Sequence, residues 1–466
     1  MKYLKILFLF SLLIGCKLSD KKETPVNTFK GTDGEVKLIV LAPGHFHADL
    51  LQKNKLKQLN DSVYVYGQKG SELDQYLTRV ESYNNREENP THWQEVVYSG
   101  ADFLEKMLSE KKGNVVVLAG NNRDKTNYIF ESAAAGLNVL SDKPMAINKE
   151  NFELLKLAYD TAQANNVMLY DMMTQRYDAL EIIERKLLNN KDLFGELQLG
   201  TESEPAMSME SVHHFYKEVS GQPLIRPAWY YDVEQQGEGI ADVTTHLIDI
   251  AHWKSFPEEE INYTEDVEVL SATHWPTVLS LADFTKSTNV ETFPKYLEKY
   301  IEDDMLKVYA NGTIHYKVKD VNVALKVIWN YKAPDGTGDT FSSLIKGSKA
   351  SLKTIQDKST NFTKQLYIVK ATDVNKDEFD SNLHDAVEEI KKDYPTVSIE
   401  ASNSTSGEYL INIPAEEKSD HETHFQNVAQ SFFDILVNQN MPKWEVSNTL
   451  TKYYIITTAL DLAKEN

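Results

Sequence analysis

Two short segments of this chain carry residues that can accept, donate and stabilise a proton. Asp242 and His246 stand four residues apart, a spacing that places both side chains on one face of a helix. Lys143 stands about 100 residues earlier, in Asp142-Lys143-Pro144. Histidine has an ordinary pKa near 6.5 and therefore suits the role of a base at neutral pH. Together the three residues would form a proton-transfer set suited to oxidising a sugar alcohol.

Each segment has an ordinary interpretation when it is taken alone. An Asp–His pair at this spacing is often a surface or capping pair, and a lysine before proline is often a loop charge. The functional interpretation therefore depends on whether the fold brings the two segments together.

The first third of the chain alternates between short apolar runs and amphipathic segments, a pattern that predicts a doubly wound parallel sheet. The expected strands are 36–41, 63–66, 115–119, 139–140 and 167–170. The expected helices are 47–59, 127–135 and 151–165. Ligands of such sheets bind at the carboxyl ends of the strands, where the Gly120-Asn121 turn and Asp142-Lys143-Pro144 would lie.

The second part of the chain alternates apolar and polar residues over longer stretches, which favours a largely antiparallel, open sheet with one wet face. The expected strands are 266–272, 306–309, 313–318, 321–331 and 340–345, and the expected closing helices are 421–438 and 446–464. The sequence therefore predicts an α/β architecture, with a Rossmann-type domain over 35–172 and an α+β domain for substrate binding and oligomerisation over 173–466.

The order of these motifs resembles the Gfo/Idh/MocA oxidoreductases, the glucose–fructose oxidoreductase and inositol dehydrogenase family. That family has an asparagine turn, a helix ending in Ala-Gly, and then Glu-Lys-Pro; this chain has 119–122, Ala135-Gly136 and Asp142-Lys143-Pro144. The segment 237–249 is similar to the family's Gly-rich segment, in which an aspartate and a histidine are separated by three residues. The resemblance implies bound NAD or NADP, with Lys143 between substrate and nicotinamide, where its ammonium would stabilise the developing alkoxide.

The first turn of the expected nucleotide site departs from the family pattern. The usual Gly-x-Gly-x-x-Gly is replaced by 41–47, Leu-Ala-Pro-Gly-His-Phe-His, in which one glycine survives. No acidic residue ends the second strand, and Glu72 is the nearest candidate for the ribose. A helix beginning near His45 could still hold a phosphate. The residues expected to contact the cofactor are Gly44, His45, Phe46, His47, Gly120, Asn121, Asn122, Asp142, Lys143 and Arg176.

The substrate side of the expected site includes Asp242, His246 and an aromatic segment before them. Trp229 and Tyr230 could pack on the apolar faces of a sugar, and Arg226 could pair with a carboxylate or sulfate, although core packing explains the rings as well. Two histidine groups suggest a metal, but 213–214 are adjacent and 421 and 424 are three apart, where a zincin motif needs four. No metal centre is expected from the sequence.

The N-terminus predicts export and a lipid anchor. Residues 1–15 have a positive start and an apolar run too short to span a bilayer, and the run ends before Cys16 in a pattern similar to a bacterial lipobox. Cys16 is the one cysteine of the chain, which excludes an internal disulfide. Residues 16–34 read as a tether, so the protein is expected on a membrane of the cell envelope; an ordinary cleaved signal is the alternative.

These observations predict a cell-envelope lipoprotein that oxidises a sugar, polyol or glycoside with tightly held NAD or NADP in carbohydrate catabolism. The formal charge of −21 disfavours nucleic acid and anionic lipid as partners. Relatives often pair through the exposed sheet face, so a homo-oligomer is an option. Two alternatives stay open: net glycoside hydrolysis by oxidation and elimination, and a cofactor-free glycan-binding lipoprotein.

Overall fold

The structure is a computed structural model that describes residues 29–219, 222–402 and 407–465. The expected signal segment 1–15 and Cys16 lie outside the described residues, as does most of the expected tether. Within these described ranges, no helix is long and apolar enough to cross a membrane.

The N-terminal sheet consists of six parallel strands in the order β3-β2-β1-β4-β5-β6. Their bounds are β1 Leu38–Leu41, β2 Ser62–Tyr66, β3 Gln94–Tyr98, β4 Val115–Leu118, β5 Asn138–Ser141 and β6 Leu169–Asp171. β1 and β4 are adjacent at the point where the strand order reverses, and the carboxyl ends of strands at such a switch point border a ligand crevice. This confirms the doubly wound parallel sheet.

Helices cover both faces of this sheet. The longer ones are α2 Ser71–Asn85, α3 Phe103–Glu110, α4 Lys125–Ala134 and α5 Lys149–Ala164. The helix expected over 47–59 is wrong, because α1 spans only His47–Leu50. The carbonyl of Gln52, which a longer helix would use, instead accepts a hydrogen bond of 2.6 Å from the Trp93 indole.

The second sheet is mixed and mostly antiparallel, in the order β10-β12-β13-β7-β14-β15-β16-β18-β17, with β11 paired to β12. Its strands are β7 Met207–Tyr216, β10 Val267–Leu279, β11 Ile301–Glu302, β12 Met305–Val318, β13 Val321–Lys332, β14 Thr340–Lys346, β15 Ala350–Gln356, β16 Gln365–Lys370, β17 Ser398–Ala401 and β18 Glu408–Asn412. β13 and β7 are parallel, while the other pairs are antiparallel. The strands expected over 306–309 and 313–318 are one strand, β12.

Short elements connect the two sheets. They are α6 Ala179–Leu188, the β8–β9 hairpin of Glu218–Val219 and Gln222–Pro223, α7 Val233–Gln236, α8 Gly239–Asp242 and α9 Thr244–Ser255. Three of them, α7, α8 and α9, contribute residues to the cavity described below. Two further helices, α10 Leu281–Thr288 and α11 Lys376–Ile390, lie in the segments that follow β10 and β16.

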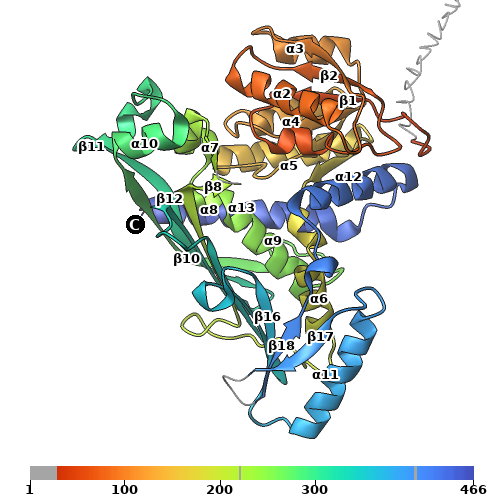
Figure 1. The fold of residues 1–466 in the computed structure, drawn as a ribbon, viewed down its shortest axis with the longest axis vertical. Helices are drawn as coiled ribbons and strands as arrows, with labels where there is room; N and C mark the ends of the chain where they lie inside the picture. The colour runs from red at the N-terminus through yellow and green to blue at the C-terminus, as the bar shows by residue number, and fades with distance from the viewer. Residues whose placement is uncertain (1–28, 220–221, 403–406, 466) are drawn as a thin grey trace, which may run out of the picture.

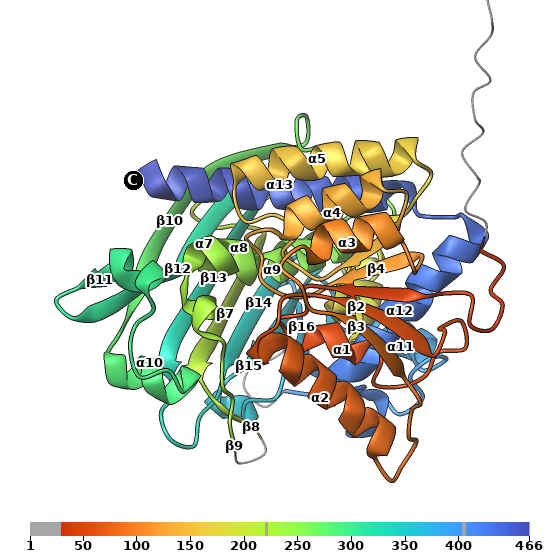
Figure 2. The ribbon, with the colours of Figure 1, turned by 90° about the horizontal axis from the view of Figure 1, so that it is seen from above.

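The two closing helices tie the sheets together. α12 (His421–Asn438) and α13 (Lys443–Glu465) confirm the predicted helices. Phe425, Val428 and Phe432 of α12 share a buried apolar cluster with strands β1 and β2, so this helix covers the N-terminal sheet although it comes from the end of the chain. Figure 1 shows α12 beside the N-terminal domain, and Figure 2 shows α13 lying along α5.

Candidate functional site

Lys143 and Asp242 meet where the two domains face each other. Lys143 follows β5, and its Nζ donates to Asp242 Oδ1 at 2.7 Å and to the Asp242 carbonyl at 3.3 Å. Both side chains are largely buried. The sequence-based prediction that these two segments converge is therefore confirmed for this pair.

A close helix–strand contact sets the position of Asp242. At Gly239, the first residue of α8, an added Cβ would lie 1.9 Å from the carbonyl oxygen of Ala310 on β12. Only glycine permits this approach. α8 ends at Asp242, and Val243 keeps right-handed helical backbone angles before α9 begins, so His246 lies in the first turn of α9.

The pKa directions define the charge states of these groups. Burial alone would raise the pKa of Asp242, but the Lys143 ammonium beside it holds that pKa below its usual value. Burial likewise opposes the charge of Lys143, but Asp242 and Asp142 raise the pKa of its ammonium. The pKa of His246 is lowered well below 6.5 by burial and then by the Lys143 charge. At neutral pH the set is an ammonium, a carboxylate and a neutral imidazole.

His246 also carries an unsatisfied polar atom. Its Nδ1 is buried and has no hydrogen-bond partner among the described residues. Leaving such an atom unpaired costs about 1–3 kcal/mol, a cost that a bound hydroxyl or water would remove. An unpaired polar atom in a residue that lines a cavity favours a functional role for His246.

These three residues line one cavity of about 420 Å³. Seven residues predicted from the sequence line it: His45, Phe46, His47, Lys143, Tyr230, Asp242 and His246. The sequence reasoning missed further lining residues from the second sheet and its neighbours, among them Gln175, Ser211, Lys217, Trp329, Asp339 and Phe341. His213 and His421, which the sequence marked only as unpromising metal ligands, also line it.

One wall of the cavity combines an aromatic ring with a histidine and an acid. His213 stacks on Trp329, with ring centroids 4.9 Å apart, and its Nε2 lies 2.8 Å from the Ser211 hydroxyl. Asp339 lies beside His213 and pairs with His214 and Lys217. A flat ring beside polar groups can pack on the apolar face of a sugar while its hydroxyls find partners.

Arg226 and Trp229 do not line this cavity, and the structure corrects their assignment to the substrate. Arg226 donates to the carbonyls of Phe215 and His214, and its guanidinium lies 4.6 Å from the Tyr230 ring centroid. Arg226 thus packs against Tyr230, which lines the cavity, without lining the cavity itself. The indole of Trp229 donates a hydrogen bond of 2.7 Å to Glu72. Glu72 is the residue that the sequence offered as a candidate to hold the ribose, and its carboxylate is therefore already engaged.

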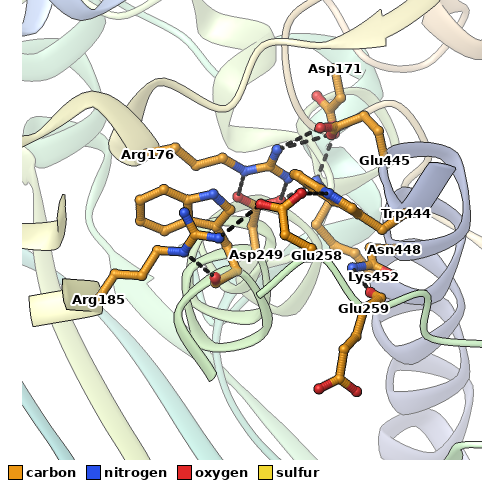
Figure 3. A network of polar contacts seen from close by, with 11 residues as sticks. Asp171, Arg176, Arg185, Asp249, Glu258, Glu259, Trp444, Glu445, Asn448 and Lys452 are labelled. Atoms are coloured by element: carbon orange, nitrogen blue, oxygen red, sulfur yellow. Dashed lines mark hydrogen bonds and ion pairs between the residues drawn. The ribbon is translucent and has the colours of Figure 1, made fainter. Parts of the chain in front are cut away.

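Arg176 is likewise a structural residue, which corrects its assignment to the cofactor. Its guanidinium donates two hydrogen bonds to Asp249 at 2.6 and 2.7 Å and two to Glu445 at 2.9 Å. Lys452 joins the same network by pairing with Asp171 and Asp249 at 2.9 and 3.0 Å. Figure 3 shows these side chains converging from β6, the short 3-10 helix Thr174–Tyr177, α9 and α13.

The turn after β1 is folded onto the turn after β4. The amides of Gly44 and His45 both donate to the Ala119 carbonyl at 3.2 Å. An added Cβ on Gly120 would lie 2.4 Å from the Ala42 carbonyl oxygen and 2.9 Å from the Gly44 amide nitrogen, so glycine is needed at 120 for this close packing. Asn121 and Asn122 donate to α7, at 2.8 and 2.7 Å. The predicted phosphate contacts of this turn stay a prediction, because α1 is a single turn and these two amides are already used.

Comparison with known proteins identifies the family. Residues 183–464 match the family model described as "Putative oxidoreductase C terminal domain". A solved structure of a "putative oxidoreductase" from Parabacteroides merdae is 46% identical, with 94% of this chain and 99% of that chain covered and a TM-score of 0.92. The chain belongs to the Gfo/Idh/MocA oxidoreductases.

More distant structures share the fold. A "putative oxidoreductase" from Thermotoga maritima is 14% identical, with 92% and 98% of the two chains covered and a TM-score of 0.58. The WlbA dehydrogenase from Bordetella pertussis, solved with NADH and UDP-GlcNAcA, is 15% identical, with 93% and 97% covered and a TM-score of 0.52. No curated protein sequence matches the chain. The family and the fold together assign the protein to the oxidoreductases.

Proposed function

We propose that this oxidoreductase oxidises a hydroxyl group of a sugar, polyol or glycoside, with NAD or NADP held tightly in the N-terminal domain. One observation carries the proposal. An ammonium, a carboxylate and a neutral imidazole with an unpartnered nitrogen line the same cavity at the carboxyl ends of β1 and β5. The oxidation of an alcohol needs such groups, because the hydroxyl loses a proton while its carbon gives up a hydride.

The described residues fit a nicotinamide cofactor at the reactive end of the crevice. Gly120 lets the turns after β1 and β4 approach closely without a side chain between them, and the buried Nδ1 of His246 has no partner among the described residues. Lys143 lines the cavity, and the turns that hold Gly44 and Gly120-Asn121 follow β1 and β4 at the switch point of the sheet. The cofactor would accept the hydride; the neighbours solved with NADH or NAD support this choice.

The residues of the chain divide the remaining work. Lys143, held by Asp242, would donate a hydrogen bond to the substrate oxygen and stabilise the negative charge that develops on it. The neutral imidazole of His246 would accept the hydroxyl proton. Trp329 and Tyr230 would pack against the sugar ring and exclude water from the reacting groups.

A panel of sugars, polyols and glycosides tests this function. Each compound is mixed with the purified protein, and the near-ultraviolet absorbance of reduced nicotinamide is followed through a single turnover. We expect at least one carbohydrate to reduce the bound cofactor, and we expect Lys143→Met to abolish the signal even when that variant is loaded with cofactor to the same occupancy. If no compound reduces a cofactor shown to be present, the carbohydrate assignment fails.

We further propose that the protein is a lipoprotein of the cell envelope that works in carbohydrate catabolism. The charged start, the apolar run and Cys16 support the anchor. Outside the cytoplasm a loosely bound dinucleotide would be lost, so tight retention is consistent with this location. Growth with labelled palmitate tests the anchor: label is expected in the natural chain and absent from Cys16→Ser, and label retained in that variant would contradict it.

A further inference from the structure

The turn after β1 brings two histidines against a buried aspartate. His47 Nδ1 lies 2.9 Å and His45 Nδ1 3.8 Å from Asp142 Oδ2. The two imidazole rings are perpendicular, with centroids 4.1 Å apart. One ligand atom from each of the three residues lies within 4.8 Å of the others.

The contacts of the Asp142 carboxylate leave the two imidazoles as its direct partners. The Asp142 carboxylate is buried, and its ion-pair partners among the described residues are the two histidines alone. The nearby ammonium of Lys125 donates instead to the main-chain carbonyl of Asp142, and Lys143 pairs with Asp242. The carboxylate therefore contacts the two imidazoles, while the neighbouring ammonium groups bond elsewhere.

The donor set and its spacing suit a transition metal. Imidazole nitrogens and one carboxylate bind Zn²⁺ or Fe²⁺ at about 2.0–2.2 Å, with the remaining positions left for water or substrate. Ligand atoms at that radius lie about 3–3.5 Å from one another. The measured 2.9 and 3.8 Å lie on either side of this range, and the half-exposed ring of His45 can close the longer distance.

The cluster also has an entry path. His45 and His47 line the cavity that holds Lys143, Asp242 and His246, so an ion can enter from the cavity. We propose that His45, His47 and Asp142 bind one divalent transition-metal ion at the wall of this cavity, with open coordination positions facing the ligand. The sequence motifs gave no reason to expect this site, because Asp142 is 95 residues from His47. The proposal does not depend on the redox function.

Metal content tests the site directly. The full chain is purified on a tag without histidine, stripped with a chelator, and reloaded with Zn²⁺ or, in a second sample, Co²⁺. We expect about one tightly bound ion per chain by elemental mass spectrometry, and visible absorption bands from the cobalt form that report nitrogen and oxygen ligands. Reloaded protein with no stoichiometric ion would overturn the proposal.

Three variants locate the ion. His47→Ala and Asp142→Asn are expected to lower the bound metal at least tenfold, and His45→Ala, which removes a more exposed ring and spares the buried core, is expected to do the same. His424→Ala is the matched control, because that histidine pairs with Ser419 and is not a member of the cluster. Equal metal content in all four variants would show that the ion binds elsewhere and would contradict the proposal. Circular dichroism confirms that each variant is folded.

Discussion

Two buried charge clusters lie side by side along α9 and differ in how completely they are satisfied. His246 begins the helix in the cavity, with an unpartnered Nδ1. Asp249, three residues later, accepts hydrogen bonds from Arg176 and Lys452. Pairing of both Asp249 carboxylate oxygens fixes the joint between the domains (Figure 3), although Asp171 Oδ1 in the same network has no partner among the described residues. The unpaired nitrogen of His246 differs because its residue lines a cavity.

The comparison predicts that the cavity cluster controls turnover and the Arg176 cluster controls stability. His246→Ala is expected to lower the rate of substrate oxidation by about 10²–10⁴-fold, because the hydroxyl proton loses its acceptor. The melting temperature is expected to change little, since the variant removes an unpaired buried atom. His384→Ala, on the exposed face of α11, is the control. An unchanged rate in His246→Ala would contradict the assignment of turnover to the cavity cluster.

The Arg176 cluster should show the opposite response. Arg176→Met leaves the carboxylates of Asp249 and Glu445 buried without their main partner, a change that costs about 3–5 kcal/mol of unfolding free energy. Chemical denaturation measures this loss. A variant with unaltered stability but lost cofactor would instead restore the functional role that the sequence suggested for Arg176.

A surface arginine provides the matched comparison. Arg185 pairs with Glu258 at 3.3 Å, and the carboxylate of that pair is exposed. Because solvent screens exposed ion pairs, Arg185→Met is expected to cost at most about 1 kcal/mol in the same denaturation experiment. A loss as large as that of Arg176→Met would show that burial does not set the difference.

The pH dependence of turnover sharpens the role of His246. Its pKa is lowered, chiefly by burial, so the imidazole stays neutral at pH 6.5, where an exposed histidine is about half protonated. The rate should therefore be flat from about pH 8 to 6.5 and fall only at lower pH, as the base becomes protonated. The unfolding free energy depends on pH in the same direction. Folding favours the neutral imidazole of His246, so the stability that this group contributes is lost as the pH falls through its lowered pKa. An acid limb centred above pH 6.5 would contradict the assignment.

Particular residues show what the sequence could and could not predict. Apolar runs such as 115–118 become central parallel strands because they are buried on both faces, and that pattern is visible locally. The meeting of Lys143 with Asp242 followed from the family order of two motifs. The partners of Arg176 could not be predicted in this way, because Glu445 is 269 residues away and the pairing depends on how α13 packs. The end of α1 was missed for the same reason: Trp93, which accounts for it, comes from a distant segment.

The second sheet shows the same limit. Its strands β10, β12, β13 and β14 were predicted from alternation, although β12 was expected as two pieces. β7 was missed, yet it lies between β13 and β14 and presents Ser211 and His213 to the cavity. The pairing of His214 with Asp339 spans 125 residues, so no local pattern indicates that wall of the site.

The most direct measurement of the central claim is the mass of the small molecules released when the purified natural protein is denatured. The account predicts about one NAD or NADP per chain, retained through purification. Protein that releases no nicotinamide dinucleotide, and that takes up none when it is supplied, would contradict a redox role for Lys143, Asp242 and His246.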